Sequence, residues 1–317
     1  MIGPNSLACT IIWHLDPIPF KTQPRHDRGM RDSSDWLPTA YRSHTIGQVV
    51  TDGGDMVGTQ VTLAGYAESV RGRGGVCFVM LRDGTGRIQA FLKRDAMDES
   101  VFESIQSSSR ESTISVTGVV AQKRPPKTPE GVPAPPPEYE VSVSSAEILA
   151  LAEAPLPVGV VDDVNVGLDV RLDNRHLDVR RAHVNAMFQL RSKVLQYGRE
   201  HLIEEGFSEM NSPKIIASAS EGGTNLFPMM YFDTPAYLSQ SPQLYKQLAV
   251  LGGLERVFEI GPAFRAEKHD TYRHLNEFVS FDIEAAWCDD EDVMGVLERM
   301  IHSIWSRISA DDQDLVD

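Results

Sequence analysis

The chain has 317 residues, a formal net charge of −15 at pH 7 and 41% hydrophobic residues, which is enough apolar material for two domains with cores of their own. The acidic balance argues against a protein that coats nucleic acid, although a local basic face on an acidic body can still bind RNA. Three widely spaced cysteines without a CxxC pair argue against a disulfide framework and a zinc site, and favour a reducing cytoplasm.

The first forty residues contain little that predicts a folded structure. Residues 1–20 are mildly apolar, but they hold three prolines and lack a basic start, so they make a poor signal peptide. No apolar run in the chain approaches membrane-spanning length. We expect residues 1–40 to be a disordered extension or a misassigned start, with Met1 or Met30 as the initiator.

Residues 45–150 are strand-like and are interrupted by one helical segment. Asp83-Gly84-Thr85-Gly86 is typical of a tight hairpin turn between two of the strands. The expected elements, in chain order, are the strands Val57–Tyr66, Val76–Arg82 and Arg87–Leu92, the helix Ala96–Ser107, and the strands Thr113–Ala121 and Tyr139–Val143. Five short strands with a helix after the third indicate an OB-fold barrel. Residues 124–137 hold seven prolines, which predicts an exposed loop before the last strand.

Residues 151–182 have the composition of a linker or hinge. Their charged run, Arg171–Arg180, suits a hinge or a solvated helix start. Residues 183–317 contain both helical and strand patterns, so that the chain as a whole is expected to be α+β. We expect the helix Ala186–Glu205, a strand Phe207–Ile216 that carries Pro213, antiparallel strands around Val257–Ile260, Phe264–Phe278 and Phe281–Glu284, and the helix Asp292–Arg307.

The segments Phe264–Glu267 and Thr271–Phe278 suggest a strand–loop–strand hairpin that grips a triphosphate, because a guanidinium binds phosphate oxygens through two hydrogen bonds. Ordinary surface ion pairs would explain these residues equally well if they stood alone. Upstream, however, lie Ser220–Phe227, with a Glu-Gly-Gly-Thr core, and Ser239–Gln247, which reads Ser-Gln-Ser-Pro-Gln-Leu-Tyr-Lys-Gln. In this order the motifs resemble class II aminoacyl-tRNA synthetases, specifically the aspartyl branch of archaea and eukaryotic cytosol.

The resemblance implies an anticodon-binding barrel followed by a partial class II catalytic domain, an antiparallel sheet with flanking helices. It implies an aspartate–tRNA ligase that uses ATP and Mg²⁺ to activate L-aspartate and transfers it to tRNA(Asp) in the cytoplasm. The helix and strand of residues 186–216 correspond to motif 1, which in this family builds a homodimer interface.

The resemblance also assigns the ATP-binding residues. Arg265 would bridge the α-phosphate and the substrate carboxylate, and Arg273 or His274 would hold the β- and γ-phosphates. Glu267 would contact adenine or the terminal adenosine of tRNA, and Phe278 would stack on adenine, with Leu275 beside them. A solvated loop histidine and a plain core phenylalanine are the alternatives for His274 and Phe278.

The same motifs assign the residues that would bind the substrate aspartate. Lys246 and Gln243 would bind the β-carboxylate of aspartate, since a buried lysine left without a counter-charge disfavours asparagine. Glu221 and Asp282 would bind the substrate ammonium, Arg265 the reacting carboxylate, and Ser241 would orient the substrate. Ser241-Pro242 also reads as a helix N-cap with proline at the first helical position.

The predicted barrel has more basic than acidic residues around its second and third strands, and Asp83 is the only acid counted near them in the sequence. The members of this basic excess are Arg71, Arg73, Arg82, Arg87, Lys93 and Arg94. By resemblance, Phe78 stacks on the central anticodon base, Gln89 and Glu140 read base edges, and Arg82 and Lys127 contact the anticodon loop. The alternative is a basic face that only increases solubility.

Two departures from the family pattern stand out. Glu68 stands where enzymes strict for tRNA(Asp) carry an aromatic residue, which raises tRNA(Asn) as a second substrate. Nothing after Asp282 resembles the arginine-ending motif 3 or the magnesium ligands of complete relatives, so we expect a fragment with weak adenylation and with no metal ligand of its own. A tRNA-binding module or paralogue without catalysis remains open, and Lys246 disfavours an asparagine-specific relative.

Overall fold

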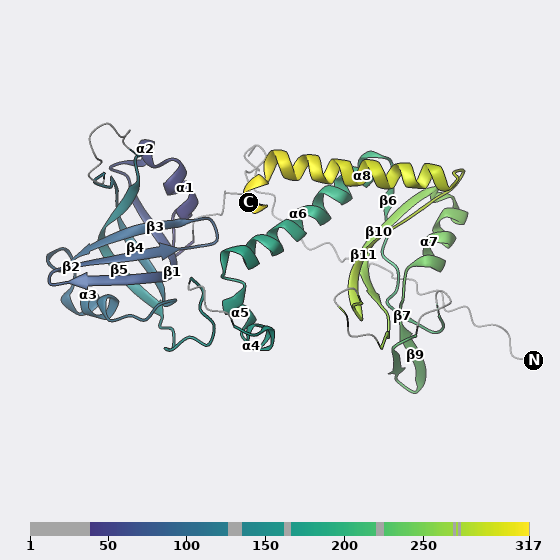
Figure 1. Ribbon diagram of the computed structural model, residues 1–317, viewed down its shortest axis with the longest axis horizontal. Coiled ribbons are helices and arrows are strands. Elements are labelled where there is room, and N and C mark those ends of the chain that lie inside the picture. Colours follow the sequence, from purple (N-terminus) through teal and green to yellow (C-terminus); the bar gives the residue numbers. More distant parts are fainter. Residues whose placement is uncertain are drawn as a thin grey trace, which may run out of the picture. The chain divides into compact units, whose positions relative to one another are not determined.

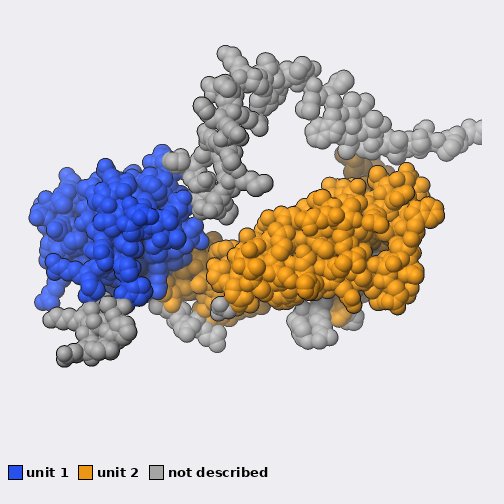
Figure 2. Space-filling view, turned by 90° about the horizontal axis from the view of Figure 1, so that it is seen from above, with its two compact units in different colours: residues 1–156 blue, residues 157–317 orange. Residues whose placement is uncertain are grey.

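The computed structural model describes residues 39–125, 135–161, 166–219, 225–268, 271 and 274–316. The chain divides into two compact units, residues 1–156 and 157–317, which Figure 2 shows in blue and orange. Figure 1 gives the order of the helices and strands along the chain. Each unit has its own hydrophobic core.

The first unit is a closed five-stranded barrel, as predicted for an OB-fold. Its strands pair in the order β1-β2-β3-β5-β4, and the helix α3 follows the third strand. The bounds are β1 Gln60–Arg73, β2 Val76–Arg82, β3 Arg87–Lys93, the 3₁₀ turn Arg94–Ala96, α3 Glu99–Gln106, β4 Thr113–Gln122 and β5 Tyr139–Ala150.

Two short helices precede the barrel where the sequence pattern suggested strand. Thr45 caps α1 (Ile46–Thr51): its hydroxyl accepts the Gln48 N–H, and the Gln48 side chain accepts the Thr45 N–H. The second helix, α2, spans Gly53–Met56. The first barrel strand therefore begins at Gln60, three residues later than predicted.

Strand alternation fills the barrel interior with apolar side chains, among them Leu63, Val79, Leu81 and Leu92. The predicted hairpin turn is fixed by Asp83, whose Oδ1 accepts the N–H groups of Thr85 and Gly86 at 2.7 and 3.1 Å. The outward residues of β2 and β3 consequently form one face, on which the predicted RNA contacts lie.

The segment after the barrel contains two short helices, α4 (Leu168–Asp173) and α5 (Arg175–Asp178). The buried carboxylate of Asp178 accepts a 2.8 Å hydrogen bond from Arg171 Nε and contacts Arg175 and Arg181. The hydrogen bond from Arg171, with the charges of Arg171 and Arg175, holds the pKa of Asp178 below its usual range. The charged run is therefore organised around one carboxylate.

The second unit is built on the long antiparallel pair β10 (Arg256–Phe264) and β11 (Glu277–Ala285), as predicted. The two-residue strand β6 (Ser208–Glu209) pairs with β10 in parallel. A separate sheet has the order β7-β9-β8, with bounds Ile215–Ile216, Thr234–Leu238 and Pro228–Tyr231. The helices are α6 Ala182–Glu204, α7 Gln243–Ala249, with a π-helical turn Val250–Leu254, and α8 Asp290–Asp311.

The single strand predicted over Phe207–Ile216 is wrong. The segment forms two strands, β6 and β7, that belong to different sheets, and Pro213 lies between them. Proline lacks the N–H needed to continue a ladder, so the chain can leave one sheet there and join the other. The helix α8 ends at Asp311, and a 3₁₀ turn, Gln313–Leu315, follows it.

The helices α6 and α8 cover one face of the β10–β11 pair. Phe258, Phe281 and Ile283 on that face pack against apolar side chains of α6 and α8. The approach is close at Gly198 of α6, where a Cβ would lie 2.6 Å from the Phe281 ring. Because strand side chains alternate, Glu259, Asp282 and Glu284 point to the opposite face.

Candidate active site and nucleic-acid interface

Lys246 of α7 is the central charge on the face of the sheet opposite α6 and α8. Its side chain is 4% exposed, and its Nζ lies 3.1 Å from Asp282 Oδ1 and 3.7 Å from Glu284 Oε2. The ammonium also donates to the Ile283 carbonyl at 3.0 Å. Gln243, one helical turn earlier, donates from Nε2 to Glu284 Oε2 at 3.3 Å. The structure therefore gathers three of the predicted aspartate-binding residues, Gln243, Lys246 and Asp282.

The start of α7 sets the direction of these side chains. Pro242 is the N-cap and Gln243 the first helical residue, so the predicted cap at Ser241 is wrong by one position. Ser241 still assists, because its buried hydroxyl accepts the Gln243 N–H at 3.4 Å. Residues 243 and 246 then share one face of the helix, toward β11.

The loop end of the β10–β11 hairpin carries Arg265, Glu267 and His274, which were predicted to bind ATP, and Phe278 lies at the start of β11. The Arg265 guanidinium lies over the Phe278 ring, 5.3 Å from its centroid, and the Arg265 N–H donates to the Asn276 carbonyl. His274 Nε2 lies 3.8 Å from Glu267 Oε2, and His274 Nδ1 lies 2.7 Å from Thr271 Oγ1.

Three further residues were predicted for the site. Leu275 is exposed on the same loop. Glu221 and Arg273 lie outside the described residues. The Ala266 N–H donates to the Asn225 carbonyl at 2.9 Å, so Asn225 meets the hairpin beside Arg265.

The ATP-site residues around Phe278 and the charged residues around Asp282 lie at different points along β11. Phe278 and Asp282 share a face of β11 and are four residues apart, a separation of about 13 Å. Ser280 lies between them and donates to Asp282 Oδ2 at 2.6 Å. The face therefore offers a compact charged subsite beside a larger aromatic and cationic one.

A buried carboxylate in this face was not anticipated from the sequence. Glu259 accepts the Ser212 N–H at 2.7 Å and is ion-paired with Lys214. The one available signal was a lone acidic residue within the apolar run Val257–Ile260. A carboxylate at a buried strand position requires partners, but the sequence does not say which.

The carboxylates of this face are the groups that could be considered as metal ligands. Lys246 lies between Asp282 and Glu284, and Lys214 contacts Glu259, so these carboxylates already hold ammonium groups. Across the described parts of the chain, no group of three or more histidine, cysteine or acidic residues could hold a metal ion. This donor set fits cationic amino groups better than Mg²⁺.

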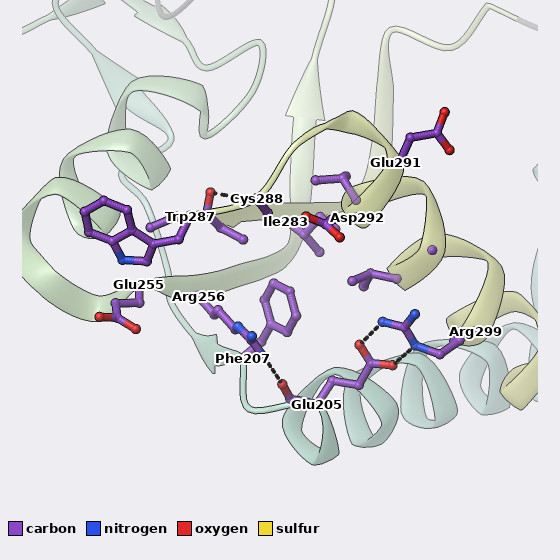
Figure 3. A pocket seen from close by; sticks show the side chains of 15 residues that line it. Glu205, Phe207, Glu255, Arg256, Ile283, Trp287, Cys288, Glu291, Asp292 and Arg299 are labelled. Atoms are coloured by element: carbon purple, nitrogen blue, oxygen red, sulfur yellow. Dashed lines mark hydrogen bonds and ion pairs between the residues drawn. The ribbon is translucent and has the colours of Figure 1, made fainter.

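A cavity of about 380 Å³ lies on the helix-covered side of the sheet, and Figure 3 shows its lining. The floor includes Phe207 and Ile283, and Trp287 stands at the rim. Arg299 donates to Glu205 at 2.5 and 2.9 Å across one wall. Because Ile283 belongs to the covered face, this cavity is separate from the Lys246 subsite.

The barrel brings together three of the predicted anticodon-binding residues. Phe78 of β2 stacks on Phe91 of β3 with 5.1 Å between ring centroids, and it remains 38% exposed. Gln89 pairs in register with Glu140 of β5 and donates to its Oε2 at 2.7 Å. An aromatic platform thus lies on the same outer face as a polar pair with hydrogen-bonding groups.

Three of the six cations in the basic excess, Arg82, Arg87 and Arg94, are ion-paired, which corrects the statement that Asp83 is the only nearby acid. Arg82 lies 2.8 Å from Glu111 and 3.5 Å from Glu68. Arg94 contacts Glu99 and Glu103 at 2.6 and 3.0 Å. An anticodon contact by Arg82 would therefore compete with two carboxylates. Lys127 lies outside the described residues.

Comparisons with known families match both units. Residues 167–316 match the model for class II tRNA synthetases (D, K and N), and residues 61–149 match the OB-fold nucleic acid binding domain. In the part of the chain that the structure describes, no helix is long and apolar enough to cross a membrane.

Curated relatives and solved structures agree with these matches. The Aspartate--tRNA(Asp/Asn) ligase of Archaeoglobus fulgidus is 47% identical over 255 residues, 80% of this chain and 57% of the relative. That of Methanosarcina barkeri is 45% identical over 251 residues, 79% of this chain and 54% of the relative. The chain thus spans little more than half the length of these relatives.

Among solved structures, a putative aspartyl-tRNA synthetase from Leishmania major has a TM-score of 0.75 at 31% identity, covering 90% of this chain and 55% of that one. Asparaginyl-tRNA synthetase from Pyrococcus horikoshii, complexed with asparaginyl-adenylate, has a TM-score of 0.72 at 33% identity, covering 83% and 58%. The fold is therefore shared by relatives named for two different amino acids.

Proposed function

The chain belongs to the class II tRNA synthetases of the aspartate, lysine and asparagine group, and on that premise we propose that it serves as an aspartate–tRNA ligase. The observation that carries the choice of amino acid is the buried Lys246 ammonium, 3.1 Å from Asp282 and 3.7 Å from Glu284. The names of the relatives support the same choice.

The charge of this subsite suits aspartate. Lys246 supplies one positive charge, and Asp282 and Glu284 supply two negative charges, so the α-ammonium of an amino acid compensates the excess. The 3.7 Å contact with Glu284 is longer than a hydrogen bond, so a substrate β-carboxylate can take that position on the ammonium. The amide of asparagine would bring no negative charge to Lys246, so it gains less from the ammonium than the β-carboxylate of aspartate does, which disfavours asparagine.

The neighbouring subsite suits ATP. In the proposed reaction a carboxylate oxygen of aspartate attacks the α-phosphorus, the bond to the pyrophosphate oxygen breaks, and aspartyl-adenylate and pyrophosphate form. Arg265 would hold the α-phosphate and the attacking carboxylate together, while Phe278 stacks on adenine. Arg273 and His274 would bind the β- and γ-phosphates. Glu267 would contact adenine or the terminal adenosine of tRNA, with Leu275 beside Glu267.

The second step transfers aspartate to tRNA. A ribose hydroxyl at the 3′ end attacks the adenylate carbonyl, and AMP leaves. We assign anticodon recognition to residues 45–150, with Phe78 stacking on a base and Gln89 and Glu140 reading its edge. Residues 151–182 would act as the hinge and residues 183–317 as the catalytic part.

Charging of two tRNAs is also proposed. Glu68, at the bulge of β1, is engaged by Arg82 and Arg87, so this position offers paired charge rather than an aromatic surface. Relatives at 41–47% identity are named Aspartate--tRNA(Asp/Asn) ligase. We expect a cytoplasmic homodimer formed through α6 and residues 207–216, since Met187, Phe188 and Ile203 of α6 are exposed.

The test is aminoacylation by the complete protein that contains this chain. Transcripts of tRNA(Asp) and tRNA(Asn) are incubated with ATP and either radiolabelled aspartate or asparagine. The proposal predicts aspartate on both transcripts and asparagine on neither. Binding of tRNA without charging would instead indicate an RNA-binding module.

A further inference from the structure

Glu259 lies in the middle of β10, on the face of the sheet that carries the aspartate subsite. Its side chain is 2% exposed and stands directly opposite Asp282 in the antiparallel register. Two carboxylates placed opposite each other repel, so each needs a cation of its own. Lys246 neutralises Asp282, and Lys214 neutralises Glu259.

The partners of Glu259 tie a neighbouring segment to the sheet. Ser212 donates its backbone N–H to Glu259 Oε2 at 2.7 Å, and Lys214 Nζ donates to Oε1. Lys214 Nζ also donates to Ser212 Oγ at 3.1 Å. One carboxylate therefore fixes both sides of Pro213, where the chain passes between the two sheets.

This segment in turn holds the start of α7. The Lys214 carbonyl accepts the Ser239 N–H at 2.9 Å, and Ser239 Oγ donates to the Ser241 carbonyl at 2.8 Å. Ser241 lies next to Pro242, the N-cap of the helix that carries Lys246. The Ser239 carbonyl also accepts the Phe264 N–H at 3.0 Å, next to Arg265.

The path of the Glu259 side chain depends on a glycine. A Cβ at Gly261 would lie 2.8 Å from Glu259 Oε1, closer than real Cβ contacts allow. The carboxylate thus occupies space that only glycine leaves open at this position. An alanine there would displace the carboxylate without changing any charge.

We infer that Glu259 is a positioning residue for aspartate. It does not reach the substrate; it holds the Ser212–Lys214 segment, and through Ser239 and Ser241 it sets where Lys246 meets Asp282. The inference rests on the proposed function. It predicts that loss of Glu259 weakens the aspartate subsite more than the ATP subsite.

The test compares Glu259→Ala with Glu259→Gln in the complete protein by aspartate-dependent ATP–pyrophosphate exchange. Alanine removes both hydrogen-bond acceptors, and we expect the KM for aspartate to rise roughly tenfold or more, with the KM for ATP changed less than about twofold. Glutamine keeps an acceptor for the Ser212 N–H and should fall between alanine and wild type. An unchanged aspartate KM in the alanine variant, or an equal rise in both KM values, would overturn the inference.

Two further variants keep the test decisive if Glu259→Ala folds poorly. Gly261→Ala retains every charge and should raise the aspartate KM in the same selective way; no selective rise would count against the inference. Glu298→Gln, which neutralises an exposed carboxylate of α8 in the same unit, is the control and should leave both KM values unchanged. If the wild-type protein shows no aspartate-dependent exchange, the proposed function fails, independently of Glu259.

Discussion

Replacing Lys246 by methionine removes the only cation that contacts both Asp282 and Glu284 among the described residues. At an effective dielectric constant of about 20, unit charges 3.1 Å apart attract by about 5 kcal/mol before desolvation is counted. The two carboxylates are 21% and 27% exposed, so water compensates part of this loss. We therefore expect Lys246→Met to lower the free energy of unfolding by about 3 kcal/mol, the lower end of the range for a broken buried pair.

Thermal unfolding of the chain provides the measurement. For a unit of this size, about 3 kcal/mol corresponds to a fall in Tm of roughly 6–12 °C. Arg199→Met is the matched control, because Arg199 Nε also lies 3.1 Å from a carboxylate, that of Glu209, but both side chains are about a third exposed. That variant should cost less than about 1 kcal/mol. Equal falls in Tm in the two variants would refute the view that burial makes the Lys246 ion pair more stabilising than the exposed one.

Two further predictions concern the barrel and the hinge. Phe78→Ala should weaken tRNA(Asp) binding by roughly 5- to 150-fold in a filter-binding assay, since stacking on an aromatic contributes about 1–3 kcal/mol per base. The control is Val119→Ala, which changes an exposed apolar residue of β4. Equal losses of affinity in the two variants would contradict the assignment of Phe78. Arg171 lowers the pKa of Asp178, so this carboxylate stabilises the fold above about pH 4 and the benefit is lost as the pH falls further. The Tm difference between wild type and Asp178→Asn should accordingly shrink from about pH 5 to about pH 3, and a constant difference would rule out this role.

Local patterns predicted the barrel and the long hairpin because each depends on neighbouring residues. Alternation in the strands and the Asp83 turn specify the β2–β3 pair without distant information. The helix α1 escaped prediction because six residues are too few to show a helical period, although the Thr45–Gln48 capping box marks its start.

The site was predictable only where motif and position coincided. Gln243, Lys246 and Asp282 come together as expected, across 36 residues between Lys246 and Asp282. The Glu259–Lys214 pair could not be predicted, because its partners are 45 residues apart and meet only after the chain has crossed between two sheets. The pairing of Arg82 with Glu111 was missed for the same reason, since the carboxylate arrives from the turn before β4.

The central claim is that the Lys246 subsite selects aspartate for activation by ATP. ATP–pyrophosphate exchange by the complete protein, measured with aspartate and with asparagine at equal concentrations, tests it most directly. The account predicts exchange at least about a hundredfold faster with aspartate, because the asparagine amide offers the buried ammonium no negative charge where aspartate offers a carboxylate. Equal exchange with the two amino acids, or faster exchange with asparagine, would contradict it.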